Sequence, residues 1–438
     1  MNSGMVSLGF SMSIVPRHLS GRVQRALATS RVVNIVGPRQ VGKTTLVRDI
    51  IPIGHYLTLD DGAVRRAMET DAFSQLSSLR SDVIPSLPVV IDEVQRVPEV
   101  GLALKRIVDT ERQPGQFLLT GSADIFTYAK ALDSLAGRVQ TLTLRPLSAA
   151  EIHGAGPARI LDSALDEKPM SALPKPVTYT RQEAIELMVR GGYPEIRGLE
   201  DPDRADRYAS YLDSIVERDV EHLFPVRRPD NLRRMMDQLA YRTANELNIS
   251  DLCSDIGIKH VTATTYMDAL INLGVVHQLG AWASGRASRE IKRPKIHMMD
   301  TGVATAVRGE DAHSYDLTAD PTALGPVLET FVFNELEKSL PHQSQRWRLY
   351  HWRDQRGREI DIVAEAPRRR LALFEMKASA DVVSSDFKHA EWFFGSDGPA
   401  KGYQGVAFVV YLGQHLLSFG PGKIALPLSV FWSYSAVD

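Results

Sequence analysis

Over the first third of the chain, short apolar runs alternate with stretches in which apolar residues recur at helical spacing. A short apolar run is typical of a strand that is buried on both faces, whereas the helical spacing is typical of an amphipathic helix. Because strands that alternate with helices are joined by crossovers, the pattern predicts a parallel sheet with helices on both faces. The runs that we interpret as strands are 32–36, 56–59, 89–91, 117–119 and 139–144.

The pattern changes after Pro146. Residues 154–176 are rich in Pro, Ala and Gly, and they predict an exposed loop at a domain boundary. Thr180 and Glu183 have the spacing of a capping box, which predicts the start of a helix. Residues 203–223 predict a second, long amphipathic helix whose apolar stripe faces a core.

Residues 231–280 contain three helical patterns followed by an apolar strand, which is the order of elements in a winged helix. The third pattern starts with short polar and cationic side chains, and a basic loop follows the strand. Such side chains suit phosphate contacts and entry into a DNA groove. Winged helices also serve as protein-contact or lid modules, so both interpretations stay open. The residues concerned are Lys259, His260, Thr262, Thr264, Thr265, Arg286, Arg289, Lys292, Arg293 and Lys295.

A second α/β pattern occupies the end of the chain. A helix is predicted from residue 325, and strands are predicted at 348–352, 359–364 and 371–377. The domains that these patterns predict are 14–150, 177–300 and 301–438.

Composition bounds the class of protein. The chain has 438 residues, which exceeds one ordinary domain of roughly 100–200 residues. The net charge of -2 gives no overall electrostatic case for a nucleic-acid or membrane protein, so any such contact must be a local patch. Cys253 is the one cysteine, which excludes an internal disulfide and fits a reducing cytosol. No apolar run reaches the roughly 18 residues of a membrane span, and the start of the chain lacks a basic front. We therefore expect a cytoplasmic protein.

The segment after the first predicted strand carries the strongest chemical signal. It has the form GxxxxGK[ST] between a strand and a helix, which is the pattern of a phosphate-binding loop, or P-loop. Its glycines let successive N–H groups point at phosphates, and the helix adds the positive end of its dipole. We expect Lys43 to reach the β- and γ-phosphates and Thr44 to bind Mg²⁺. The residues of the predicted nucleotide-binding loop are Gly37, Pro38, Arg39, Gln40, Val41, Gly42, Lys43, Thr44 and Thr45.

Two acidic residues follow the apolar run at 87–91, at a position suited to nucleotide hydrolysis. The apolar run at 87–91 ends in Asp92 and Glu93, so both carboxylates emerge at the carboxyl end of a predicted parallel strand. We expect Asp92 to hold Mg²⁺ through water and Glu93 to orient or deprotonate the water that attacks the γ-phosphate. Asp60, which closes the preceding strand, is a further candidate on the metal side.

Two hydroxyl residues follow the strand at 117–119. Thr120 and Ser122 would lie beside the phosphate site in the predicted sheet. They either contact the γ-phosphate and its water or satisfy the local backbone of a turn.

The C-terminal pattern holds a second constellation of charged residues. Glu329 lies on the predicted helix, Asp361 on one strand, and Glu375 and Lys377 on one face of the next strand. Acidic oxygens that hold Mg²⁺, with a lysine that stabilises the attacking hydroxide, are the parts of a metal-dependent phosphodiester hydrolase. The arrangement resembles a PD-(D/E)xK nuclease core, although an E-x-K triplet is also explained by an ordinary edge-strand ion pair.

The motifs taken in order resemble one family, the prokaryotic AAA-type ATPases that carry a C-terminal domain known as DUF4143. The resemblance covers residues 15–394 and implies ATP rather than GTP, together with a nuclease-like terminal domain. Arg138, Arg145 and Arg218 are candidates for an arginine finger or for structural ion pairs. The motifs that carry the resemblance are GPRQVGKTT at 37–45, IDEVQ at 91–95, LTGSA at 119–123, LAGRV at 135–139, RPLS at 145–148, GGYPE at 191–195, ERDV at 217–220, DTG at 300–302, Glu329, EID at 359–361 and EMK at 375–377.

Three functions therefore compete. The first is a Mg²⁺-dependent ATPase that couples hydrolysis to a C-terminal module acting on DNA or RNA, with or without cleavage. The second is an ATP-operated switch that binds a protein partner and keeps an inactive nuclease-like domain. A transcriptional regulator that uses the winged helix is a third hypothesis, and the oligomeric state stays open.

Overall fold

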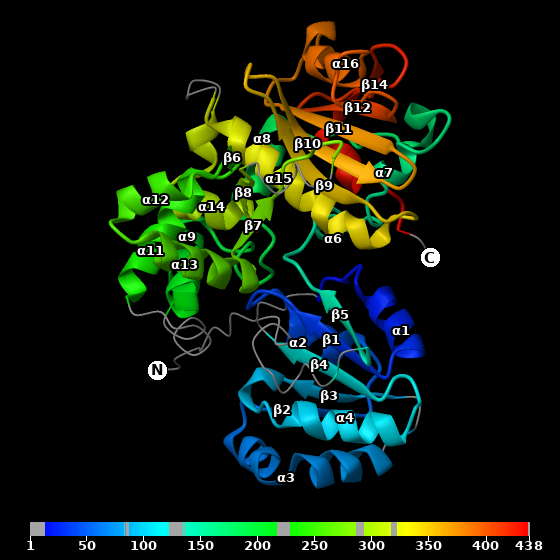
Figure 1. The fold of residues 1–438 in the computed structure, drawn as a ribbon, viewed down its shortest axis with the longest axis vertical. Helices are drawn as coiled ribbons and strands as arrows, with labels where there is room; N and C mark the ends of the chain where they lie inside the picture. Colours follow the sequence, from blue (N-terminus) through cyan, green and yellow to red (C-terminus); the bar gives the residue numbers. More distant parts are fainter. Residues whose placement is uncertain are drawn as a thin grey trace, which may run out of the picture.

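A computed structural model describes residues 14–82, 84, 87–121, 135, 137–216, 228–285, 293–316 and 322–436. In Figure 1 the first sheet lies at the bottom, the helical middle region at the left and a second large sheet at the top. No described helix is long and apolar enough to span a bilayer.

The first sheet is five-stranded and parallel, which confirms the predicted fold class. Its strand order is β2-β3-β4-β1-β5. The carboxyl ends of β1, β3 and β4 therefore meet at one edge, where an open α/β sheet binds its ligand. The strands are β1 (Val32–Val36), β2 (His55–Thr58), β3 (Val89–Asp92), β4 (Phe117–Gly121) and β5 (Val139–Thr143).

Both faces of this sheet are covered by helices. Along β3, Val90 packs into one core with α1, whereas Val89 and Ile91 pack into a second core with α3 and α4. This alternation is why the strands read as continuous apolar runs. The helices are α1 (Ser20–Thr29), α2 (Lys43–Thr45) with its π-helical continuation (Leu46–Ile50), α3 (Gly62–Ser81) and α4 (Val100–Thr110), and a 3₁₀ turn covers Val94–Arg96.

The middle region combines helices with a small sheet of order β6-β8-β7. Three helices followed by the antiparallel β7–β8 pair have the arrangement predicted for a winged helix. The predicted long helix at 203–223 is helical as far as it is described, because helical residues 215 and 216 follow α9, and residues 217–223 lie outside the described residues. The elements are α8 (Arg181–Arg190), α9 (Asp201–Ser214), α11 (Pro229–Tyr241), β6 (Asn245–Glu246), α12 (Ile249–Ile256), α13 (His260–Asn272), β7 (Val276–Leu279), β8 (Lys295–Met298) and α14 (Thr301–Val307).

The exposed loop predicted at 154–176 is wrong in part. The segment contains α7 (Ile160–Ser163) and a 3₁₀ turn (Pro169–Ala172). Ile160 and Leu161 are buried in a core that also holds side chains of the C-terminal helix α15. The apolar partner of this segment comes from a distant part of the chain, so local composition did not reveal the burial.

The C-terminal domain is a six-stranded mixed sheet of order β13-β14-β12-β11-β10-β9. Helix α15 packs on one face against Phe374 and Phe408, and α16 packs on the other against Leu373. The elements are α15 (Leu324–Ser339), β9 (Arg348–Arg353), β10 (Glu359–Ala366), β11 (Arg370–Lys377), α16 (Lys388–Phe394), β12 (Gln404–Tyr411), β13 (Leu417–Ser418) and β14 (Lys423–Pro427). Short helical elements are α6 (Ala149–Ile152) and the 3₁₀ turns Ala312–Tyr315, Leu340–His342, Ser384–Phe387 and Leu428–Trp432.

The middle region is joined to the C-terminal sheet by backbone hydrogen bonds. Beyond β7, the N–H of Trp282 donates to the carbonyl oxygen of His351 on β9 at 2.6 Å, and the N–H of His351 donates to the carbonyl oxygen of Gly280 at 3.0 Å. The middle region also shares a hydrophobic core with the first sheet. The middle region is therefore in direct contact with both the first sheet and the C-terminal sheet.

Candidate nucleotide site

The P-loop links β1 to α2 and depends on two glycines with positive φ. Gly37 has a φ of 154°, and a Cβ added there would lie 2.1 Å from the carbonyl oxygen of Leu144. Gly42 has a φ of 90° immediately before α2. Both positions exclude larger residues, because the first has no room for a side chain and the second has a backbone conformation that strains one. The loop is therefore held in a curled form that a different sequence would not adopt.

Lys43 lies under this loop. Its Nζ atom donates to the carbonyl oxygens of Gly37 at 2.9 Å and Pro38 at 2.8 Å, and the residue is 6% exposed. A buried ammonium group is thus already present at the turn of the phosphate-binding motif, which is where the sequence motif requires positive charge.

Asp92 accepts hydrogen bonds from three hydroxyl groups. Its Oδ2 atom accepts from Thr44 Oγ1 at 3.0 Å and from Tyr56 Oη at 2.6 Å, and its Oδ1 atom accepts from Thr120 Oγ1. The carboxylate itself is buried. Four segments that are far apart in sequence therefore meet at the carboxyl edge of the sheet.

Tyr56 is a site residue that the sequence did not reveal. Burial and the hydrogen bond to Asp92 raise the pKa of its phenol, so the hydroxyl stays protonated and donates to Asp92. The signal lay in the parallel pairing of β2 with β3, which sets Tyr56 opposite Val90 and Thr58 opposite Asp92. The sequence does not predict the order of strands in the sheet, so it does not predict the contact of Tyr56 with Asp92.

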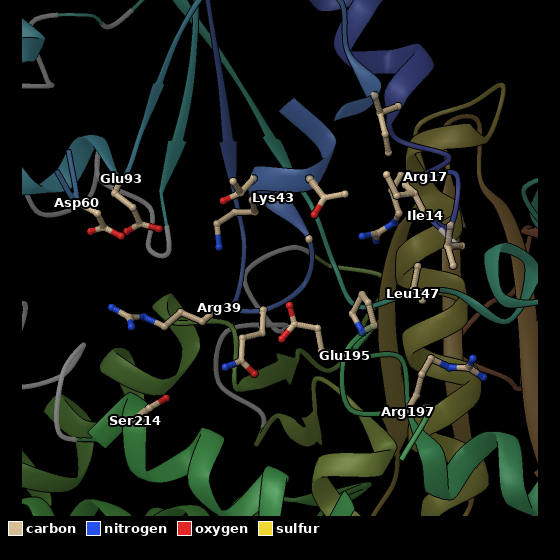
Figure 2. Close-up of a pocket in the computed structure, with 18 of the residues that line it drawn as sticks. Ile14, Arg17, Arg39, Lys43, Asp60, Glu93, Leu147, Glu195, Arg197 and Ser214 are labelled. Atoms are coloured by element: carbon tan, nitrogen blue, oxygen red, sulfur yellow. The ribbon is translucent and has the colours of Figure 1, made fainter. Parts of the chain in front are cut away.

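Glu93 has a strained backbone. Its φ is 58°, in the left-handed region that non-glycine residues seldom adopt. Burial raises the pKa of its carboxyl group above the ordinary value, and the charge of Lys43 opposes this shift. In Figure 2, Glu93 and Asp60 lie together on one wall of the cavity and Lys43 projects into its middle. Asp60 is ion-paired with Arg96.

A cavity of about 730 Å³ opens between the P-loop and the middle region. Its volume lies within the range of roughly 300–1,000 Å³ that is common for small-molecule sites. The P-loop side contributes Arg39, Gln40, Gly42, Lys43, Thr44 and Thr45. The opposite side contributes Leu147, Pro194, Glu195, Arg197, Gly198 and Ser214, several of which are seen below the P-loop in Figure 2.

The other predicted loop residues do not line the cavity. Val41 is buried in the core, and Pro38 lies against Gly274 at the end of α13. Ser122 lies outside the described residues. Whether it contacts a nucleotide stays a prediction.

Arg17 joins the N-terminal segment to the P-loop through a hydrogen bond, and no sequence motif predicts this contact. Its Nη1 atom donates to the carbonyl oxygen of Val41 at 2.6 Å, and its Nε atom donates to Glu151 Oε1 at 3.2 Å. Burial alone would raise the pKa of Glu151, but the charges of Arg17 and His18 lower it, so the pair is ionised. One side chain therefore ties three segments together at the edge of the cavity.

Two of the three arginine-finger candidates are paired inside this chain. Arg138 donates to Asp109 Oδ2 at 2.9 Å, and Arg145 donates to Glu337 Oε2 at 2.6 Å. Neither side chain lines the cavity. Arg218 lies outside the described residues.

The second predicted constellation is brought together, with one difference. Lys295 Nζ lies 2.7 Å from Glu329 Oε1 and 3.6 Å from Asp361 Oδ1, and the N–H of Met376, the residue after Glu375, donates to Asp361 Oδ2 at 2.9 Å. Assignment of Lys295 to an exposed basic loop was wrong, because the residue is 1% exposed on β8. Lys377 is ion-paired with Asp386. Across the described part of the chain, no group of three or more His, Cys, Asp or Glu residues has an arrangement that could hold a metal ion.

Three family models match the chain. Residues 29–153 match an AAA domain, residues 181–314 match a domain of unknown function, DUF8612, and residues 324–431 match a domain of unknown function, DUF4143.

Whole-chain relatives have been found in mycobacteria. An uncharacterized protein of Mycobacterium tuberculosis and one of Mycobacterium bovis are each 29% identical to this chain over 433 residues, which is 98% of this chain and 87% of theirs.

Solved structures resemble the chain only remotely. A Walker-type ATPase of Pyrococcus abyssi is 14% identical, with a TM-score of 0.41 over 67% of this chain and 96% of that one. The RuvB Holliday junction branch migration motor of Thermotoga maritima is 18% identical, with a TM-score of 0.28 over 60% of this chain and 90% of that one. At these scores neither likeness bears on function. The P-loop and the parallel sheet agree with the first of these matches, and the chain carries an AAA domain at 29–153 and a C-terminal DUF4143 domain at 324–431.

Proposed function

We propose that this protein is a Mg²⁺-dependent ATPase that works as a nucleotide-operated switch. The observation that carries the proposal is that the P-loop and the middle region form opposite walls of one cavity. A ligand that fills the cavity contacts both parts of the chain. Its hydrolysis changes those contacts, which gives the two states that a switch requires.

The chemistry proposed for the site is mostly electrostatic. Lys43 holds the β- and γ-phosphates, and Glu93 positions the attacking water and accepts its proton. Thr44 and Asp92 offer the hydroxyl and carboxylate oxygens that Mg²⁺ prefers, and Mg²⁺ bound there with nucleotide would supply positive charge to the phosphates. The hydroxyl groups of Tyr56 and Thr120 orient the Asp92 carboxylate, because both donate to it.

The wall away from Glu93 suits a nucleoside. Ile14, Val15, Leu147 and Pro194 line the cavity with apolar atoms, which favours packing against the flat faces of a base. This end of the cavity lies between the N-terminal segment and the middle region, and it supports a nucleoside as part of the ligand.

A contact between the P-loop and α13 supports coupling to the middle region. Gly274 follows α13 and has a φ of 68°, and a Cβ added there would lie 2.8 Å from Pro38 Cγ. A phosphate group that reshapes the loop at Pro38 therefore presses on the end of a helix of the winged-helix-like region. The other end of α13 is exposed at Lys259, His260 and Val261.

The substitution Gly274→Ala is expected to weaken ATP binding about tenfold, because the new methyl group pushes Pro38 and distorts the phosphate cradle. Gly257→Ala is the matched control. Gly257 also ends a helix with positive φ, at 77°, but a Cβ there has no neighbour within 4 Å. Both variants should lose about 1 kcal/mol of unfolding free energy through backbone strain. Nucleotide affinity measured by titration calorimetry, with unfolding followed in parallel, separates the two effects.

Equal nucleotide affinity in the Gly274→Ala and Gly257→Ala variants would contradict the proposed contact route. A protein that binds no ATP in Mg²⁺ buffer would contradict the proposed function as a whole.

A second candidate function is nucleic-acid binding through the start of α13. The exposed residues Lys259, His260 and Thr264 form a polar, cationic helix start, as expected for contacts to phosphates. We expect Lys259→Glu to weaken duplex binding about tenfold at low salt and to make the salt dependence shallower. Fluorescence anisotropy with DNA and RNA duplexes measures both quantities.

The control for this experiment is Lys401→Glu, an exposed lysine of the C-terminal domain. Equal losses in the two variants would point to non-specific charge effects, and no binding by the unmodified protein would leave the protein-partner switch as the better description.

A further inference from the structure

Three carboxylate residues of the C-terminal domain are ion-paired with one lysine from the middle region. Lys295 Nζ lies 2.7 Å from Glu329 Oε1, 2.6 Å from Glu359 Oε1 and 3.6 Å from Asp361 Oδ1. Glu375 lies beside Met376, whose N–H donates to Asp361 Oδ2 at 2.9 Å, and the Oε1 atom of Glu375 is buried without a hydrogen-bond partner. The ammonium group therefore occupies the place among these oxygens that a bound cation would take.

The position of Lys295 is set by the backbone. The residue starts β8, the central strand of its sheet, and pairs with Glu246 on one side and Leu279 on the other. The carbonyl oxygen of the preceding residue, Pro294, accepts a hydrogen bond from the N–H of Leu247 at 2.8 Å. The backbone at Lys295 is therefore held on both sides, which places its side chain at the cluster.

The charges of the cluster fit a resident lysine. Burial lowers the pKa of Lys295, but the carboxylates of Glu329, Asp361 and Glu359 raise it further, so the ammonium stays charged. Burial and the neighbouring carboxylate of Asp361 raise the pKa of Glu329 and of Glu375 well above the ordinary value. These shifts favour the neutral forms of Glu329 and Glu375, so fewer negative charges remain for the one ammonium to balance.

The lysine of the E-x-K triplet is engaged elsewhere. Lys377 is ion-paired with Asp386, whose Oδ2 atom also accepts the N–H of Val383 at 2.8 Å. The side chain that a nuclease would need beside Glu375 is held by a different carboxylate. The lysine present at the cluster is Lys295.

One further side chain with a nitrogen atom that could bind a cation faces the cluster. His297 lies two residues along β8 and is fully buried, and its Nε2 atom has no hydrogen-bond partner and lies 4.0 Å from Glu329 Oε1. Its Nδ1 atom is within 3.2 Å of Thr330 Oγ1. Burial and the charge of Lys295 lower the pKa of His297, so the ring is neutral. Removal of the ammonium would leave carboxylate oxygens and a neutral imidazole nitrogen facing one space.

We propose that Lys295 is the resident cation of this carboxylate cluster, and that it makes the C-terminal domain a charge-locked anchor for the middle region instead of a metal-dependent nuclease. This ion-pair cluster adds to the backbone hydrogen bonds that His351 makes with Gly280 and Trp282, so the two regions are joined at two places. The inference does not depend on nucleotide binding, because none of the cluster residues lines the P-loop cavity.

The test replaces Lys295 with an uncharged residue and measures the unfolding midpoint with and without Mn²⁺, in the absence of nucleotide. Lys295→Met should lower the unfolding midpoint by about 10 °C, because it leaves buried carboxylates without their cation. Millimolar Mn²⁺ should then raise the midpoint of this variant by about 3 °C or more, whereas the unmodified protein should show no such rise. Adding Asp361→Asn to the variant should cancel the rise. Lys377→Met is the matched control, and it should gain no response to Mn²⁺.

Two results would overturn the proposal. One is stabilisation of the unmodified protein by Mn²⁺ that Asp361→Asn abolishes, since the cluster would then be a native metal centre. The other is a folded Lys295→Met variant that ignores Mn²⁺. If that variant does not fold, the proposal is tested on the unmodified protein instead. Its lysines are acetylated chemically, and the labelled positions are identified by mass spectrometry. Lys295 should resist acetylation with and without Mn²⁺, and labelling that rises with Mn²⁺ would show displacement of the lysine by the metal.

Discussion

Replacement of Glu93 by glutamine is expected to lower ATP turnover by about 10²–10⁴-fold while ATP binding is kept. The amide preserves the size of the side chain and its place on the cavity wall, but it cannot accept a proton from the attacking water. Phosphate release gives kcat, and titration with an ATP analogue gives the affinity. The exposed Glu99, six residues further on, supplies the control Glu99→Gln, which should change neither quantity.

The pH dependence of turnover gives a second readout of Glu93. A general base acts only when it is deprotonated, and burial raises the pKa of this carboxyl group. Turnover should therefore fall on acidification at a higher pH than for an ordinary carboxylate. The residual rate of the Glu93→Gln variant should lack this acidic limb. Normal turnover in the variant would remove Glu93 from the proposed role and leave ATP binding untouched.

Lys43→Ala is expected to weaken ATP binding on the order of 100-fold, because the phosphates lose the buried ammonium group that would pair with them. The same change leaves the carbonyl oxygens of Gly37 and Pro38 without the donor that they have now. Unfolding must therefore be followed in parallel, so that a collapsed loop is not mistaken for lost charge. Lys105→Ala on α4 removes a lysine that does not line the cavity, and it should bind ATP normally.

Unchanged affinity in a folded Lys43→Ala variant would mean that the cavity holds its ligand in some other way. The P-loop assignment would then fail, whereas the Mn²⁺ experiment on Lys295 would be unaffected. The two proposals can therefore fail separately.

The parallel sheet was predictable because its determinants are local. Val89, Val90 and Ile91 form a run without polar residues, and the structure buries them on both faces of the sheet. The curl of the P-loop was predictable for the same reason, since Gly37 and Gly42 stand where the backbone takes positive φ. Short-range backbone preference and burial pattern act on neighbouring residues, so a sequence displays them directly.

Contacts between distant segments were not predictable. Tyr56 reaches the site because of the order of the strands, and Arg17 is held there by an ion pair with Glu151. Neither residue belongs to a sequence motif. The predicted loop at 154–176 packs into a core that it shares with α15. In each case the partner is separated by many residues, and composition gives no sign of it.

Lys295 is the clearest example of a residue whose environment the sequence does not predict. In the sequence it follows a basic stretch, and a charged residue beside other charges is typical of a solvated loop. Only the folded chain sets β8 against β10 and α15, which buries the ammonium among carboxylates.

By itself, the sequence determined the parallel α/β sheet, the glycine-hinged phosphate loop and the acidic end of β3, because backbone geometry and apolar periodicity are properties of adjacent residues. The tertiary structure alone decided which side chains surround Asp92, which region closes the nucleotide cavity and which lysine neutralises the C-terminal carboxylates. Those outcomes depend on strand order and on the burial of charge between domains, and both arise only when remote segments pack together.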